Sequence, residues 1–292
     1  MSEGDALAPA VLVLGKGGVG KTTVAAALAS LAAERDGRAA LVEFGDGEAG
    51  RRALKGAHRG VEHLVIEASE AIHRGAAPLF GSATLARLAL GNFAMRPLLK
   101  AAPAVRELAM LEAVRQAVAA RPGVRVVVDM PATGHAVAWL RTAQQGRAFL
   151  GSGPMYDLCD RVARELVAPG RASPVVVTLP ERLVIEETLE LCDALARDPG
   201  LPVSRIVVNR VPVPLPRASY EEVRALADGG GALAEHARAL REVFEAREAA
   251  FAEAERALDD AGGHRAMWRV PLAQRDPSAS EVAAWLRAEG AR

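Results

Sequence analysis

Short runs of apolar, often β-branched residues recur along the chain, and longer stretches with helical spacing separate them. Seven such runs lie at 11–14, 40–44, 63–68, 124–130, 174–179, 204–210 and 268–272. Continuous apolar runs of this length are typical of strands buried on both faces of a parallel sheet. The Ala- and Leu-rich stretches between them, such as 22–37 and 185–200, indicate helices. This alternation predicts an α/β fold: a doubly wound, mostly parallel sheet of about seven to eight strands flanked by helices.

Two stretches depart from the alternation of strands and helices. Residues 69–120 read as helical without a convincing strand, which predicts an all-helical insertion. Residues 220–260 are rich in Ala, Glu and Arg and are interrupted by three consecutive glycines at 229–231, which predicts a solvated helix pair or arm. Because no repeat or linker divides the chain, we expect residues 1–292 to form one domain that carries both elaborations.

The charge balance, the cysteine content and the start of the sequence indicate which partners and which cellular compartment to expect. The chain has 292 residues with 36 basic and 36 acidic side chains, so no global positive field favours nucleic acid as a partner. Two cysteines, Cys159 and Cys192, are too few for a disulfide framework. The acidic, polar start of the chain lacks the pattern of a secretion signal, and no run approaches the roughly 18 apolar residues of a membrane span. We therefore expect a cytoplasmic protein with no transmembrane segment.

The strongest motif is GKGGVGKTT at 15–23, which follows an apolar run and precedes a helical stretch. It satisfies the P-loop pattern G-x-x-x-x-G-K-[ST], in which glycines let backbone N–H groups point at phosphate oxygens and the following helix presents its positive end. In that frame Lys21 contacts the β- and γ-phosphates, the Thr22 hydroxyl binds Mg²⁺, and Thr23 reaches the α-phosphate. The residues expected to bind ATP in this loop are Gly15, Lys16, Gly17, Gly18, Val19, Gly20, Lys21, Thr22 and Thr23.

A second motif, VVVDMPATGH at 126–135, places Asp129 at the end of a buried strand. A carboxylate there, opposite a P-loop, is positioned to hold Mg²⁺, in this case through water. We therefore expect Thr22 and Asp129 to be the metal-binding pair.

Three stretches together resemble one branch of the P-loop proteins. The extra lysine in K-G-G-x-G-K-[ST]-T, at Lys16, resembles the deviant Walker A loop of a group that includes ParA, MinD and the arsenical-pump ATPases. The string DMPATGH is similar to the D-T-A-P-T-G-H signature of the arsenical-pump-driving and tail-anchored-protein-targeting (ArsA-like) ATPases, and TLPERLVIEET at 178–188 resembles a further block of that branch. The chain thus resembles a bacterial ArsA-like member of unassigned role.

The resemblance implies roles for several residues. In the ArsA-like relatives the first lysine reaches the partner's nucleotide, which implies that Lys16 acts across a homodimer, or across a heterodimer with a related chain. Residues 131–135 would be switch II. Asn209, Pro271 and Leu272 would frame the purine.

The carboxylate that orients the attacking water is less defined, because VEFGDGEAG at 42–50 departs from the relatives' S-T-D-P-A-H block. Strand register favours Asp46, while Glu43 and Glu48 lie close enough to compete. A solvated acidic loop is the remaining alternative.

These features predict a Mg-ATP-dependent dimeric ATPase switch with Lys16, Lys21 and Asp46 as its catalytic residues. The expected output is nucleotide-gated binding of a protein client with a hydrophobic segment, for which apolar residues between 79 and 111, including Met110 and Leu111, offer either a groove or only a helical core. A ParA/MinD-type positioning ATPase is the alternative. An arsenite-type pump ATPase fits less well, because the clustered cysteines that bind arsenite in relatives are missing.

Overall fold

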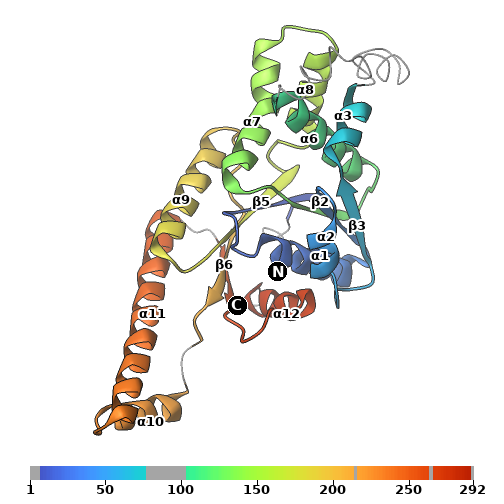
Figure 1. Cartoon of the computed structure of the whole chain (residues 1–292). Helices are drawn as coiled ribbons and strands as arrows, with labels where there is room; N and C mark the ends of the chain where they lie inside the picture. Colours follow the sequence, from blue (N-terminus) through green and yellow to red (C-terminus); the bar gives the residue numbers. More distant parts are fainter. Residues whose placement is uncertain (1–6, 77–102, 214–215, 263–265, 291–292) are drawn as a thin grey trace.

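The computed structural model describes residues 7–76, 103–213, 216–262 and 266–290 (Figure 1). Its strands are β1 (Ala10–Leu14), β2 (Ala39–Phe44), β3 (Val61–Ile66), β4 (Arg125–Asp129), β5 (Ala172–Thr178), β6 (Arg205–Val211) and β7 (Ala266–Pro271). Its helices are α1 (Lys21–Asp36), α2 (Glu48–Ala53), α3 (Ala68–Ala76), α6 (Pro103–Ala119), α7 (Thr133–Phe149), α8 (Pro154–Glu165), α9 (Arg182–Arg197), α10 (Arg217–Ala227), α11 (Ala232–Gly262) and α12 (Ala279–Gly290).

The seven strands form one sheet in the order β3-β2-β4-β1-β5-β6-β7, and every pairing is parallel. Each of the seven apolar runs forms one of these strands. The predicted doubly wound α/β fold is therefore confirmed. Strands β2, β3 and β4 lie on one side of β1 within the sheet, and β5, β6 and β7 lie on its other side. The strand order therefore reverses at β1, and ligands of doubly wound sheets bind at such a switch point.

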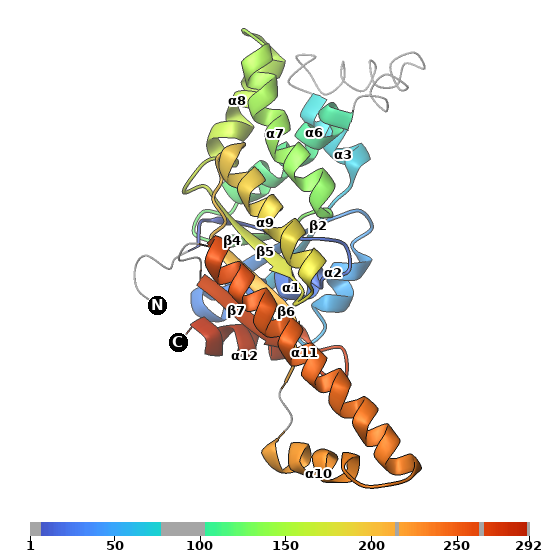
Figure 2. The same ribbon diagram turned by 90° about the vertical axis from the view of Figure 1, so that its left-hand side faces the viewer.

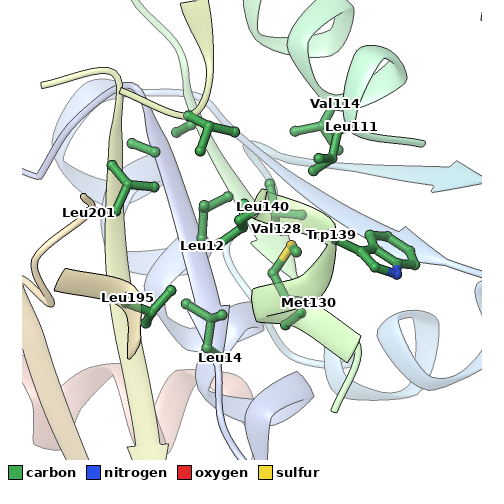
Figure 3. Close-up of a cluster of buried hydrophobic side chains, with 14 of the residues drawn as sticks. Leu12, Leu14, Leu111, Val114, Val128, Met130, Trp139, Leu140, Leu195 and Leu201 are labelled. Atoms are coloured by element: carbon green, nitrogen blue, oxygen red, sulfur yellow. The ribbon is translucent and has the colours of Figure 1, made fainter. Parts of the chain in front are cut away.

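Helices cover both faces of the sheet, and each face forms its own core cluster. Successive side chains of one strand point to opposite faces, so each strand contributes to both clusters. Val11 and Val13 of β1 belong to a core cluster that α1 and α12 cover. Leu12 and Leu14 belong to a second cluster with side chains from α6, α7, α8 and α9 (Figure 3). Because β1 is packed from both faces, its carboxyl end is held in place, and so is the glycine-rich loop that follows it.

Helices α3, α6, α7 and α8 pack together at one end of the molecule (Figure 1, top). The described parts of the predicted insertion at 69–120 supply α6 and most of α3, whereas α7 and α8 come from 133–165, outside that predicted insertion. Met110 and Leu111 are 3% and 0% exposed within the core cluster, so of the two alternatives left open for them, client groove or helical core, the structure supports the core. The other groove candidates, at 79–99, lie outside the described residues. No described helix combines the length and apolar character that a membrane span requires.

Helices α10 and α11 form a hairpin that projects away from the sheet (Figures 1 and 2). At its base, Ala254 and Leu258 of α11 are buried in the core, and α11 packs against α9. Toward the tip, α11 packs against α10; the small residue Ala234 is buried there, while the larger Leu233 is exposed. One helix thus runs from the core into the solvent.

Candidate functional site

The loop between β1 and α1 has the backbone of a phosphate cradle. Gly15, Gly18 and Gly20 have φ angles of 145°, 83° and 93°, which L side chains rarely adopt. A Cβ on Gly15 would collide with the Val177 carbonyl of β5, and one on Gly20 would collide with the Asn209 amide. The loop can therefore approach its neighbours, and a ligand, only as bare backbone.

Lys21 begins α1 and points back over the loop, where its Nζ donates a hydrogen bond to the Lys16 carbonyl oxygen at 2.9 Å. Burial lowers the pKa of the Lys21 ammonium, and the negative charge of Asp129 partly opposes that shift. A partly desolvated cation at the positive end of a helix favours an anion. The cradle therefore fits a phosphate chain.

Thr22 and Asp129 lie together beside the loop because β4 pairs with β1, with Asp129 in register with Val13. The Thr22 hydroxyl donates to Asp129 Oδ2 at 2.6 Å. Burial raises the pKa of the Asp129 carboxyl to about 6, against the opposing effects of Thr22 and Lys21. Asp129 Oδ1 is buried and has no hydrogen-bond partner among the described residues. A hydroxyl and an unsatisfied carboxylate oxygen fit Mg²⁺, which prefers oxygen ligands and retains water.

The carboxylates at the end of β2 and in the loop that follows differ in their exposure to solvent. Glu43 is 7% exposed, and its Oε2 accepts hydrogen bonds from the Gly50 backbone N–H at 2.8 Å and from His63 Nε2 at 3.0 Å. Asp46 is exposed, and its Oδ1 accepts the Glu48 N–H at 2.9 Å. Glu43 thus ties α2 to β3, while Asp46 is accessible to solvent.

The three expected purine-framing residues lie at the carboxyl ends of β6 and β7. Asn209 Nδ2 donates to the Val19 carbonyl at 2.8 Å and its Oδ1 accepts the Arg210 N–H at 2.9 Å, so this amide braces the P-loop. Pro271 ends β7, and the Leu272 N–H donates to the Val211 carbonyl at 2.8 Å. Their contact with a base remains a prediction. Because the strands are parallel, the carboxyl ends of β6 and β7 lie at the same end of the sheet as the P-loop, which follows β1.

Sequence reasoning missed two contacts around the loop. Lys16 Nζ forms an ion pair with Glu187 Oε1 of α9 at 2.8 Å, and Thr188 hydrogen-bonds Thr178 at the end of β5 at 2.8 Å. The signal was present in the block at 178–188, whose final E-T pair supplies both contacts. Residues 133–135 of the expected switch II begin α7 directly after Asp129, and their side chains lie outside the described set.

Comparison with known proteins agrees with this geometry. A family model described as the CobQ/CobB/MinD/ParA nucleotide binding domain matches residues 10–250, which include β1, the P-loop and the strands as far as β6. The chain belongs to this family. The predicted P-loop nucleotide-binding class is therefore confirmed, whereas the narrower ArsA-like branch stays a prediction.

Three mycobacterial proteins are similar to the chain, each 28% identical over 219 residues. They are the ATPase BagA of Mycobacterium tuberculosis and proteins of a second M. tuberculosis strain and of Mycobacterium bovis, which carry the provisional names ATPase MT3781 and ATPase Mb3704. The alignment covers 68% of this chain and 64% of each relative, somewhat under two thirds of their length. Together with the nucleotide-binding family, these names support the expected enzyme class, an ATP hydrolase.

Proposed function

We propose that the protein is a Mg-ATP-dependent ATPase of the ArsA-like branch that dimerises around the nucleotide and uses hydrolysis as a switch. The observation that carries the proposal is the Thr22–Asp129 pair beside the glycine cradle, with an unsatisfied carboxylate oxygen. A γ-phosphate needs both a backbone cradle and a cation site beside it. The two lie side by side here because β1 and β4 are neighbours.

The chain's own residues contribute mainly by positioning and charge. Lys21 and the loop N–H groups bind the phosphates, and Thr22 with Asp129 would hold Mg²⁺, which when bound neutralises charge on the β- and γ-phosphates. Asp46, an exposed carboxylate in the loop directly after β2, would orient the attacking water. Lys16, whose side chain is 47% exposed, would contact the phosphates of a second subunit.

The nucleotide site is joined directly to the helical end of the molecule. Asp129 is followed within four residues by α7, and β3 runs almost without a loop into α3. Phe44, which ends β2 before the Asp46 loop, contacts Trp139 of α7 edge to face with ring centroids 5.1 Å apart. Movement at the γ-phosphate can therefore reach α3, α6, α7 and α8, which supports nucleotide-gated binding of a protein client at that end.

The catalytic part of the proposal is tested by ATP turnover and nucleotide binding in three variants. We expect Lys21→Ala to lose nucleotide binding, Asp46→Asn to bind ATP and lose hydrolysis, and Lys16→Ala to lose hydrolysis through the dimer. Lys55→Ala is the matched control, since Lys55 is an exposed lysine outside the loop. Full activity of Lys16→Ala would contradict the role of Lys16 across the dimer, and full activity of Asp46→Asn would transfer its role to Glu43 or Glu48.

The client part is tested by affinity purification of Asp46→Asn with ATP, followed by identification of the bound proteins. Enrichment of proteins with an apolar helix only in one nucleotide state supports client binding. ATP-dependent binding to anionic vesicles or to DNA at moderate salt, without such enrichment, would favour the ParA/MinD-type positioning role instead.

A further inference from the structure

An apolar cavity of about 520 Å³ lies between α1, α12 and the sheet. Leu31 of α1 and Leu286 of α12 line it from the helical side, and Val11 of β1, Val127 of β4 and Trp268 of β7 line it from the sheet. These strand residues come from the first three positions of their strands, whereas the P-loop follows the last residue of β1. Because the strands run parallel, the cavity and the nucleotide site lie at opposite ends of the sheet.

One guanidinium in the cavity wall forms no ion pair within the described part of the chain. Arg125, the first residue of β4, points to the same face of the sheet as Val127. Its Nη2 donates a hydrogen bond to the Leu7 carbonyl oxygen at 3.0 Å, but its Nε is buried and finds no acceptor among the described residues. Burial lowers the pKa of the Arg125 guanidinium, and the positive charge of Arg35 acts in the same direction. A ligand that brings an anionic acceptor satisfies this group.

The other two arginines that line the cavity already have partners. Arg35 Nε and Nη2 donate to the Asp36 carboxylate at 2.7 and 2.9 Å, so Asp36, which opposes the pKa shift of Arg125, is itself held by Arg35. Arg287 pairs with Glu34, and this contact joins α12 to α1 beside the cavity. Arg35 and Arg287 also lie in the last turns of their helices, where a cation offsets the negative end of the helix dipole. Among the described residues, the cavity thus keeps one uncompensated positive charge, at Arg125.

The charged group and the aromatic side chain of the cavity come from distant strands. In the sheet, β4 and β7 are four places apart, so the backbones that carry Arg125 and Trp268 are about 19 Å apart. Apolar side chains, among them Leu28 and Leu31, make up most of the remaining lining. Small-molecule sites combine such apolar walls with a few polar groups that fix the orientation of the ligand. A long apolar chain with one anionic head has the complementary distribution.

We propose that this cavity binds a free fatty acid, an apolar chain that ends in one carboxylate. The carboxylate accepts the hydrogen bond that Arg125 Nε lacks, and the chain extends along the apolar walls toward Trp268. A pair of guanidinium and carboxylate is charge-assisted, and burial of the chain removes apolar surface from water. Binding here needs neither ATP nor a second subunit, so the inference goes beyond the proposed function.

The location is tested with a dodecanoate that carries bromine on its terminal carbon, because bromine quenches the fluorescence of a tryptophan that it contacts. The chain has three tryptophans, Trp139, Trp268 and Trp285. In nucleotide-free protein we expect saturable quenching that Trp268→Phe largely removes. Trp139→Phe is the matched control and should keep the quenching, since Trp139 belongs to the core cluster on the other face of the sheet. Quenching that persists undiminished in Trp268→Phe would overturn the proposal.

The role of Arg125 is tested by calorimetry with dodecanoate and with the uncharged dodecanol. The wild type should bind dodecanoate more tightly than dodecanol. Arg125→Gln should weaken dodecanoate binding about 10- to 100-fold and change dodecanol binding less than about twofold. Arg287→Gln, which removes a lining arginine that already pairs with Glu34, should bind both ligands as the wild type does. Equal losses of both ligands in Arg125→Gln, or no binding of dodecanoate below the concentration at which it forms micelles, would contradict the assignment.

Two competing occupants of Arg125 and of dodecanoate are distinguished by the same titration. Glu3 and Asp5 precede Leu7 in the sequence and lie outside the described residues. Binding that is missing in the wild type and present in a Glu3→Gln/Asp5→Asn variant would assign Arg125 to the chain's own carboxylates and overturn the proposal. Saturating ATP should leave dodecanoate affinity unchanged, and competition would place the ligand at the nucleotide site instead. Because no measurement depends on hydrolysis, the outcome is independent of the proposed function.

Discussion

Replacing Asp129 with asparagine should stabilise the nucleotide-free protein while it removes function. In the fold without nucleotide, burial raises the pKa of the Asp129 carboxyl from its ordinary value of 3.8 to about 6. The folded state therefore binds the proton more tightly than the unfolded chain does. The stability contributed by this proton is fully present below about pH 4 and is lost as the pH rises through about 6.

The size of the effect follows from that difference in pKa. About two pKa units correspond to about 3 kcal/mol, which is the cost of keeping the buried carboxylate charged at pH 8. An asparagine retains the oxygen that accepts the Thr22 hydrogen bond, but its amide group needs an acceptor where Asp129 Oδ1 has no described partner. We therefore expect Asp129→Asn to gain about 1 to 3 kcal/mol at pH 8 and almost nothing at pH 4.

Thermal and urea unfolding in EDTA at pH 4, 6 and 8 measure this dependence. For a domain of this size the gain at pH 8 corresponds to about 2–5 °C in Tm. With Mg-ATP the order should reverse, because only the wild type retains the carboxylate that would hold the metal. An equal change in stability at all three pH values, or a loss at pH 8, would refute the assignment of the raised pKa to burial of Asp129.

Three further substitutions test other parts of the structure. A Cβ at Gly50 would collide with the Glu43 carboxylate, so Gly50→Ala should cost about 1–3 kcal/mol in urea unfolding and reduce turnover more than ATP affinity, whereas equal losses would place the fault in binding. Leu140 is fully buried, so Leu140→Ala should cost about 2–5 kcal/mol while KM for ATP changes less than about twofold. Thr188→Val removes a buried donor and should cost about 1–2 kcal/mol in Tm-derived stability; an unchanged Tm would mean that the contact with Thr178 does not fix α9.

Much of the fold and of the phosphate site was predictable because the responsible signals are local. A strand buried on both faces must be apolar throughout, so each of the seven runs identified a strand. The cradle requires positive φ at Gly15, Gly18 and Gly20, and that requirement is visible as glycine in the sequence. The pairing of Thr22 with Asp129 followed once a buried strand could be placed beside the loop.

The remaining contacts depend on which distant segments the sheet brings together. The role of Asn209 in reading the base stays a prediction, whereas the hydrogen bond from its amide to the Val19 carbonyl, 190 positions away, depends on the strand order β1-β5-β6. The Glu43–His63 pair depends on β2 lying beside β3. Met110 and Leu111 have the composition of a groove, and only the packing of α6 against the other helices shows that they are core. Apolar composition alone does not distinguish an inward from an outward face.

The long helix α11 has a mechanical consequence. Its 31 residues span about 46 Å, with one end embedded beside α9 and the other beyond the body of the protein (Figure 2). A stiff rod held at one end works as a lever. A tilt of about 5° at the base would swing the tip by about 4 Å, roughly the width of a side chain. Because α9 also carries Glu187, which pairs with Lys16 of the P-loop, any nucleotide-dependent tilt of α11 against α9 is measurable with a distance probe on the hairpin.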